Sequence, residues 1–207
     1  MQIMQIWYKN FVVGILLVMI ILASGCKDEK ISQDSISTSE ATLNTQANDL
    51  DKKSYAGLED VFQDTSTLES KNKYMMFVFG ANGCQYCERL KEDIKNNQEL
   101  KDYIKDHFSA YYINLSYSKL HTFKIPIQKK EYELTTRQLA EIYNILPTPT
   151  IVFSNADGKT ILSYPSYLPP QQFFALLRFI SEGEWQKAQG DEAKLKSLLQ
   201  KYLTPQS

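Results

Sequence analysis

Cysteine and histidine are scarce in this chain. Its 207 residues include only 3 Cys and 2 His. A structural zinc site takes about four ligands, usually Cys or His. Beyond the pair Cys84 and Cys87, the chain offers only Cys26, His107 and His121, and the histidines are not paired at ligand spacing. We therefore expect no metal site, and the sequence indicates no other cofactor.

An excess of charge of either sign is also missing. Lysine and arginine together number 23 and aspartate and glutamate 24, which leaves a formal net charge of −1. Binding to a polyanion normally leaves a basic excess in the sequence. The composition therefore gives no argument for a nucleic-acid partner, and we expect none.

The N-terminal apolar run is short for a membrane span. Residues 11–23, after Lys9, are uncharged, and thirteen residues are typical of the apolar part of a signal peptide. The run ends in Leu22-Ala23-Ser24-Gly25-Cys26, which resembles a bacterial lipobox. The resemblance implies cleavage before Cys26 and acylation of that residue. Residues 1–25 are thus predicted to be a lipoprotein-type signal peptide. An uncleaved N-terminal anchor is the alternative.

A cleaved signal peptide and an uncleaved anchor would both place the rest of the chain outside the cytoplasm. The lipobox resemblance further implies a lipid-anchored protein on the periplasmic side of a bacterial membrane. Residues 26–53 are predicted to be a flexible polar tether, because the segment after Cys26 is rich in Ser, Thr, Asp, Asn and Gln and has no aromatic residue. Acylation of Cys26 would also explain the odd number of cysteines, since it leaves Cys84 and Cys87 as a pair.

The most informative stretch is 83–90, Gly-Cys-Gln-Tyr-Cys-Glu-Arg-Leu. The apolar run 74–79 before it predicts a buried strand, and the spacing of Leu90 and Ile94 after it predicts a helix. Cys84 is therefore expected at a helix N-terminus, where unpaired N–H groups and the helix dipole favour a thiolate. Cys87 lies one turn further on, so the two sulfurs can form a disulfide. This spacing predicts a dithiol–disulfide exchange site.

Two plainer interpretations of the Cys-x-x-Cys stretch stay open. It could be half of a zinc site, or a structural disulfide with no exchange activity.

The remaining periodicity predicts a series of helices and strands. Residues 116–134 predict either a hairpin or an ordered loop, with Thr135 or Thr136 as the cap of the helix that follows. Helices are expected over 55–70, 88–97, 99–108, 137–143, from 169 onward, and over 191–203. Further strands are expected over 109–115, 150–153 and 159–164, the last two joined by a turn at 155–158.

In this order of elements the chain resembles the thioredoxin superfamily, and within it the SoxW-like exported thioredoxins. The resemblance is carried by residues 79–90, by 139–153 with Pro-Thr-Pro-Thr at 147–150, by Asp157-Gly158, and by 167–177. It implies an α/β thioredoxin fold, with a central mixed β-sheet flanked by helices and extra helices at both ends. Residues 54–207 would form this domain and its C-terminal helical extension.

The resemblance also implies the roles of four residues. Cys84 would be the nucleophile and Cys87 the resolving thiol. Pro149 would follow a cis peptide bond beside the Cys-x-x-Cys, and the backbone of Thr148 would pair with the substrate chain. A trans Pro149 opening an edge strand is the alternative.

The chain departs from the family at several positions. Gly83 precedes the first cysteine, where many thioredoxins have Trp. The strand 77–79 carries no buried carboxylate, and Glu88, the nearest acidic residue, is more often simply solvated at such a position. Ser166 stands where the family often has Gly.

The function expected from this reading is a membrane-tethered thiol–disulfide oxidoreductase that reduces disulfides of exported client proteins. Its partners would be those clients, a membrane electron donor that restores the dithiol, and the membrane itself through the lipid anchor. A disulfide isomerase or oxidase of the same fold is one alternative. The other is a non-catalytic lipoprotein that binds a partner, with Cys84–Cys87 as a structural link.

Overall fold

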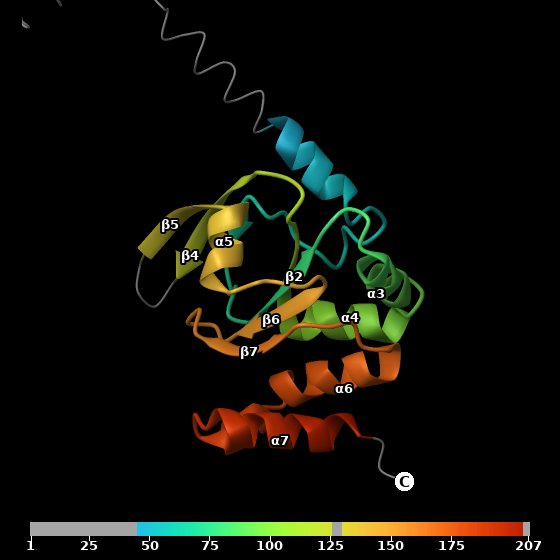
Figure 1. Ribbon diagram of the computed structural model, residues 1–207, viewed down its shortest axis with the longest axis vertical. Coiled ribbons are helices and arrows are strands. Elements are labelled where there is room, and N and C mark those ends of the chain that lie inside the picture. Colours follow the sequence, from blue (N-terminus) through green and yellow to red (C-terminus); the bar gives the residue numbers. More distant parts are fainter. Residues whose placement is uncertain (1–44, 126–129, 205–207) are drawn as a thin grey trace, which may run out of the picture. The chain divides into compact units, whose positions relative to one another are not determined.

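The computed structural model describes residues 45–125 and 130–204. A first helix spans 45–53. The later helices are α3 (Gln85–Lys95), α4 (Gln98–His107), α5 (Thr136–Ile142), α6 (Pro170–Ser181), the 3-10 helix η2 (Glu184–Ala188) and α7 (Glu192–Leu203). The strands are β1 (Thr67–Leu68), β2 (Tyr74–Gly80), β3 (Phe108–Asn114), β4 (Leu120–Ile125), β5 (Lys130–Thr135), β6 (Thr150–Ser154) and β7 (Thr160–Tyr164). Figure 1 shows their arrangement.

The strands form two sheets. The larger has the order β3-β2-β6-β7, and the smaller has the order β1-β4-β5. In the larger sheet β2 pairs in parallel with β3, whereas the β2–β6 and β6–β7 pairs are antiparallel. The sheet is therefore mixed, and together with its flanking helices it confirms the predicted α/β thioredoxin fold.

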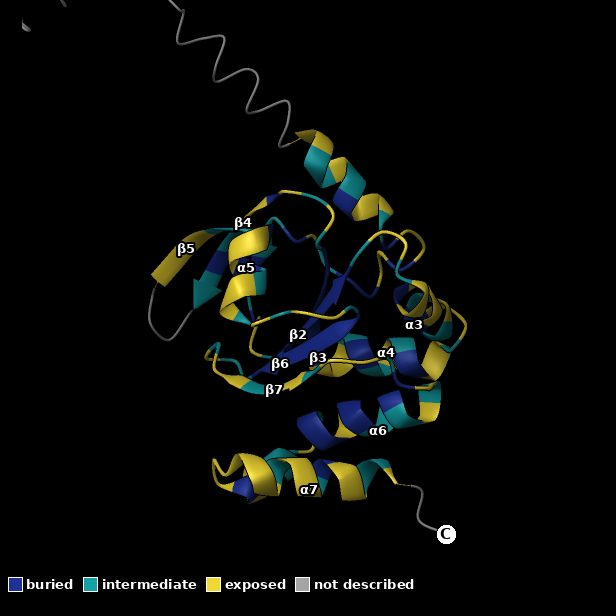
Figure 2. Cartoon of the chain, in the orientation of Figure 1, coloured by how far each residue is buried: buried dark blue, intermediate teal, exposed yellow. Residues whose placement is uncertain are grey.

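Strand β2 lies at the centre because its residues are apolar on both faces. All its residues from Met75 to Gly80 are buried, as the dark blue ribbon of β2 and β6 shows (Figure 2). Successive side chains of a strand point to opposite faces. Met76 and Val78 thus enter one hydrophobic core, whereas Phe77 and Phe79 enter another.

The two cores lie on opposite faces of the larger sheet. The first contains Leu90 and Ile94 of α3, the buried side chains of α4 and α6, and Leu199 of α7. The second is smaller and contains Leu139 of α5 and Phe123 of β4. Helix α3 thus packs on the first core through Leu90 and Ile94, at the face covered by most of the helices.

Most of the predicted elements are confirmed. The predicted strands correspond to β2, β3, β6 and β7, and the predicted helices after residue 88 to α3, α4, α5, α6 and α7. Segment 116–134 contains the antiparallel hairpin β4–β5, whose residues 126–129 lie outside the described ranges. Thr135, rather than Thr136, is the N-cap of α5, and it forms a capping box with Gln138.

The helix predicted over 55–70 is wrong. Separate turns form instead of a continuous helix: the N–H of Leu58 donates to the carbonyl of Tyr55, and the N–H groups of Val61 and Phe62 donate to the carbonyl of Leu58. The segment then becomes extended, and Leu68 of β1 pairs with Phe123. The apolar spacing that predicted a helix instead reflects residues that reach the two cores from successive turns and a short strand.

The tether predicted over 26–53 is wrong for its last part. Residues 45–53 are helical, and Asp51 at 2% exposure is buried. Residues 26–44, like the predicted signal peptide 1–25, lie outside the described residues.

Asp51 belongs to a buried polar cluster that ties the first helix to the hairpin β4–β5. Lys119 Nζ lies 3.2 Å from Asp51 Oδ2 and 2.7 Å from Thr65 Oγ1, and the Thr65 hydroxyl also donates to Asp51. His121 Nδ1 lies 2.6 Å from the carbonyl oxygen of Thr65, and its Nε2 lies 3.0 Å from Thr136 Oγ1. Since a carbonyl only accepts, Nδ1 carries the proton and Nε2 accepts from the Thr136 hydroxyl.

This arrangement predicts that acid destabilises the fold. Burial lowers the pKa of His121 below its ordinary value of 6.5, and the neighbouring Lys119 cation lowers it further against the opposing effects of the Thr65 carbonyl, Asp51 and Asp64. The unfolded chain then binds the proton more readily than the folded chain. Stability should therefore be fully present above pH 6.5 and fall as the pH decreases, by at most ~1.4 kcal/mol per pH unit from this residue.

The measurement is urea unfolding at pH 7.5, 6.5 and 5.5. His121→Gln should flatten this pH dependence, and His107→Gln serves as the matched control that keeps it. An unchanged slope in His121→Gln would show that another group causes the acid sensitivity.

Among residues 45–125 and 130–204, no helix is both long and apolar enough to cross a membrane.

Candidate active site

The two cysteines of the Cys-x-x-Cys stretch are joined in a disulfide at the start of α3. Their Cα atoms lie 5.2 Å apart. Cys84 is the N-cap of the helix, and its sulfur accepts a hydrogen bond from the N–H of Cys87 at 3.2 Å. Its carbonyl accepts from the N–H groups of Cys87 and Glu88. The Cys84 sulfur thus lies at the positive end of the helix, where an anion is stabilised.

The two sulfurs differ in accessibility. Cys84 is partly exposed, whereas Cys87 is fully buried at 0% exposure. Cys87 faces the sheet together with Leu90 and Ile94, which follow at helical spacing and are also buried. An incoming reactant can therefore approach Cys84, while Cys87 remains shielded beneath it.

Two glycines explain how the chain turns from β2 into α3. A Cβ on Gly80 would lie 2.0 Å from the Tyr112 hydroxyl, so only glycine fits at the end of the strand. Gly83 has φ +73°, a region that residues with a side chain rarely adopt. This backbone conformation gives a physical reason for Gly83, which takes the place of the Trp common in thioredoxins.

Thr148 and Pro149 lie at the same end of the sheet as the cysteines. Strand β6 begins at Thr150, which pairs with Phe79. The register therefore places Pro149 opposite Gly80, the last residue of β2, and Thr148 beyond it, where the loop to Cys84 starts. The peptide bond between Thr148 and Pro149 is cis, as the resemblance implies. Strand β6 is also an internal strand of its sheet, so Pro149 does not open an edge strand. Pro149 is buried and Thr148 half-buried.

An aromatic pair lies beside the disulfide. Tyr86, between the two cysteines, is 56% exposed and stacks on Tyr167, with ring centroids 5.7 Å apart. The Tyr167 hydroxyl donates to Asp93 at 2.6 Å, and the Arg89 guanidinium lies 5.3 Å from the centre of its ring. Side chains of α3 thereby fix the segment that leads into α6. Tyr167 lies in the segment 167–177 that carries the family resemblance, but the sequence alone does not indicate its contacts with α3.

Glu88 has the solvated character expected for its position. Its side chain is 59% exposed and pairs with Lys91 at 2.9 Å. No side chain of β2 carries a carboxylate. Cys26 lies outside the described residues, so the structure does not place it. Within the described ranges no group of three or more Cys, His, Asp or Glu side chains is arranged to hold a metal ion.

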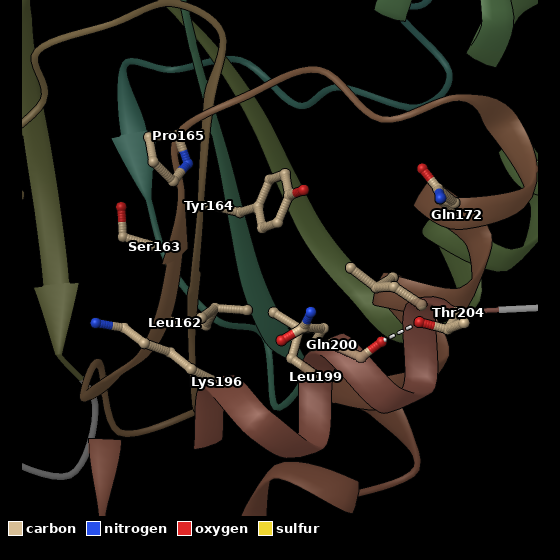
Figure 3. A pocket seen from close by; sticks show the side chains of 10 residues that line it. Leu162, Ser163, Tyr164, Pro165, Gln172, Lys196, Leu199, Gln200 and Thr204 are labelled. Atoms are coloured by element: carbon tan, nitrogen blue, oxygen red, sulfur yellow. Dashed lines mark hydrogen bonds between the residues drawn. The ribbon is translucent and has the colours of Figure 1, made fainter. Parts of the chain in front are cut away.

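A cavity of about 610 Å³ lies apart from these residues, between the edge strand β7 and helices α6 and α7 (Figure 3). Its walls include Leu162 and Tyr164 from β7 and Leu199 from α7. None of its lining residues belongs to the loop before α3 or to the segment around Pro149, so it is not part of the cysteine site.

Comparison with known families agrees with this geometry. The Thioredoxin-like domain family matches residues 61–181. The chain therefore belongs to the thioredoxin-like domain family. No curated protein matches the chain.

Among solved structures, a thioredoxin-fold protein from Helicobacter pylori is 53% identical, with a TM-score of 0.71, over 74% of this chain and 96% of that one. A disulphide isomerase from Xylella fastidiosa Temecula1 is 16% identical, with a TM-score of 0.40, over 76% of this chain and 98% of that one. A thioredoxin from Thermus thermophilus is 17% identical, with a TM-score of 0.39, over 52% and 73% of the two chains. The last two similarities are too low to carry a functional argument.

Proposed function

We propose that this protein is a membrane-tethered, extracytoplasmic thiol–disulfide oxidoreductase that reduces disulfides of exported client proteins. The observation that carries the proposal is the asymmetry of the Cys84–Cys87 pair. One sulfur is accessible and lies at a helix N-terminus, whereas its partner is buried one turn away. This asymmetry assigns different steps of one exchange reaction to the two residues.

The reaction begins from the dithiol form. The Cys84 thiolate attacks one sulfur of the client disulfide, which forms a mixed disulfide and releases the first client thiolate. Cys87 then loses its proton to water and attacks the Cys84 sulfur, which expels the second client thiolate. Both client thiolates take up protons from solvent. The client gains two electrons, and the protein ends in the Cys84–Cys87 disulfide found in the structure.

Thr148 and Pro149 supply the place where the client chain lies during this reaction. They flank the start of β6 at the end of the sheet from which Cys84 emerges. The backbone of Thr148 would pair with the client, which brings its disulfide alongside Cys84. A membrane electron donor would then reduce the protein disulfide and restore the dithiol for the next cycle.

The direct test is a reduction assay with the dithiol form and a disulfide-containing peptide. Loss of the peptide disulfide with stoichiometric formation of Cys84–Cys87 would support a reductase. Equilibration with glutathione then distinguishes a reductase from an oxidase, because it measures the reduction potential of the Cys84–Cys87 pair. The disulfide of an oxidase is less stable, and so more easily reduced, than that of a reductase. No exchange at all would favour the alternative of a non-catalytic, partner-binding protein.

The tether is tested separately through Cys26. Cys26→Ala should release the protein from the membrane fraction and leave the rate of peptide reduction unchanged, because Cys26 is proposed to carry only the lipid anchor. The measurement is fractionation of cells followed by the peptide assay on the soluble variant. A Cys26→Ala protein that stays in the membrane would show an uncleaved N-terminal anchor instead.

A further inference from the structure

The loop that carries Cys84 is held by a set of side chains outside the Cys-x-x-Cys. Asn82, two residues before Cys84, forms hydrogen bonds through its backbone N–H, its Nδ2 and its Oδ1. Its N–H donates to Ser116 Oγ at 2.9 Å, and its Nδ2 donates to the Tyr117 hydroxyl at 3.0 Å. Its Oδ1 accepts from Asn114 Nδ2 at 2.9 Å. These bonds fix the loop against the segment that follows β3.

Asn114 is the buried member of this set. It ends β3, pairs in register with Gly80, and is 3% exposed. Its Oδ1 accepts from the N–H of Ser116 at 3.0 Å while its Nδ2 holds Asn82. The Asn114 amide thus links the loop before α3, through Asn82, to the segment after β3, through Ser116.

The buried ion pair supports Asn114 from the other side. The N–H of Asn114 points to Asp51 Oδ1 at 3.5 Å, and Asp51 is paired with Lys119. Both side chains of that pair are almost fully buried, at 1% and 3% exposure. A chain of polar contacts therefore runs from the helix at 45–53, before the matched family domain, to the loop that presents Cys84.

We propose that Asn114 is a positioning residue for disulfide exchange. Its hydrogen bond to Asn82 holds the loop before α3 in place. The Cys84 sulfur, two residues after Asn82, therefore stays within hydrogen-bonding distance of the Cys87 N–H. A thiolate is stabilised by such a donor only while the geometry holds. This inference rests on the proposed function, since it assigns Asn114 a part in the reactivity of Cys84.

The test uses the full-length protein in its reduced form and the small disulfide 4,4′-dithiodipyridine as the probe. The rate of Cys84 attack is measured from pH 4 to 9, together with thermal unfolding. In Asn114→Ala the pH midpoint of the reaction should rise by about 0.5–1 unit, because the charged thiolate loses part of its hydrogen bonding. Below the midpoint the observed rate should fall by roughly threefold to tenfold, in proportion to the lost thiolate fraction.

Asn155→Ala is the matched control. The Asn155 Oδ1 accepts from the N–H groups of Asp157 and Lys159, at 3.1 and 2.9 Å, and so holds a turn at the opposite end of β6. The Asn155→Ala variant should have a lower thermal stability but the same pH midpoint of Cys84 attack as the wild type. An equal midpoint shift in Asn155→Ala would reduce the Asn114 effect to a general loss of stability and overturn the proposal.

Asn82→Ala tests the same bond from its exposed side, which keeps the proposal testable if Asn114→Ala does not fold. It should shift the midpoint in the same direction, and the double variant should shift it no further than the larger single effect. An unchanged midpoint in both single variants, with a reactive wild type, would overturn the positioning role alone. An unreactive wild type would overturn the proposed function and this inference with it.

Discussion

The reduced Cys87→Ser variant is expected to accumulate a stable mixed disulfide between Cys84 and a client, whereas Cys84→Ser forms none. Serine cannot take part in a disulfide, so Cys87→Ser retains the attack and loses the resolving step. Cys84→Ser loses the accessible sulfur, and Cys87, the remaining thiol of the pair, is 0% exposed. Both variants should reduce steady-state turnover to the uncatalysed background.

Non-reducing gels and mass spectrometry of the trapped adduct distinguish the two variants. The double variant with serine at both positions is the control for capture through any other thiol. Equal trapping by Cys84→Ser and Cys87→Ser would contradict the assignment of nucleophile and resolving residue.

Lys119→Met should destabilise the fold by about 3–5 kcal/mol, because it leaves the Asp51 carboxylate buried without a cation. Methionine fills much of the space of the lysine side chain, so the loss comes mainly from the charge. The free energy of unfolding is measured with urea at pH 7.5, where His121 is neutral.

Two further variants separate the buried charge from a simple packing defect. Asp51→Asn combined with Lys119→Met removes both charges and should recover most of the lost stability. Arg137→Met breaks an ion pair of similar length, 2.9 Å to Glu141, between side chains 88% and 62% exposed. It should cost less than about 1 kcal/mol. A double variant as unstable as Lys119→Met would show that packing dominates.

The elements around the cysteines could be predicted from local sequence because their signals are local. The apolar run of β2, the spacing of Leu90 and Ile94, and the glycines between them suffice to place Cys84 at a helix start. The side chains that alternate in β3 likewise predict a strand, and the β-branched residues after Pro149 predict the internal strand β6.

The features that the sequence did not predict depend on contacts between distant residues. Asp51 lies in a polar stretch that predicted a tether, yet its partner Lys119 is 68 positions away, and burial of that pair makes the segment part of the domain. Residues 55–70 have helical apolar spacing, but Leu68 is held as a strand by β4.

The partners of Asn114 were also hidden from a local reading. A polar residue at the end of the apolar strand β3 is a usable signal, since it marks the end of the sheet where the strand leaves the core. Its role became visible only through the bond to Asn82, 32 positions earlier in the chain.

The proposed function depends most on Cys84–Cys87 being a redox-active pair rather than a structural link. The most direct measurement is the alkylation rate of each cysteine after mild dithiol reduction, read by mass spectrometry of the two positions. A redox-active pair should be reduced readily, Cys84 should be alkylated fast even below pH 7, and Cys87 should react much more slowly. A disulfide that resists mild reduction, or two thiols that react at the same slow rate, would contradict it.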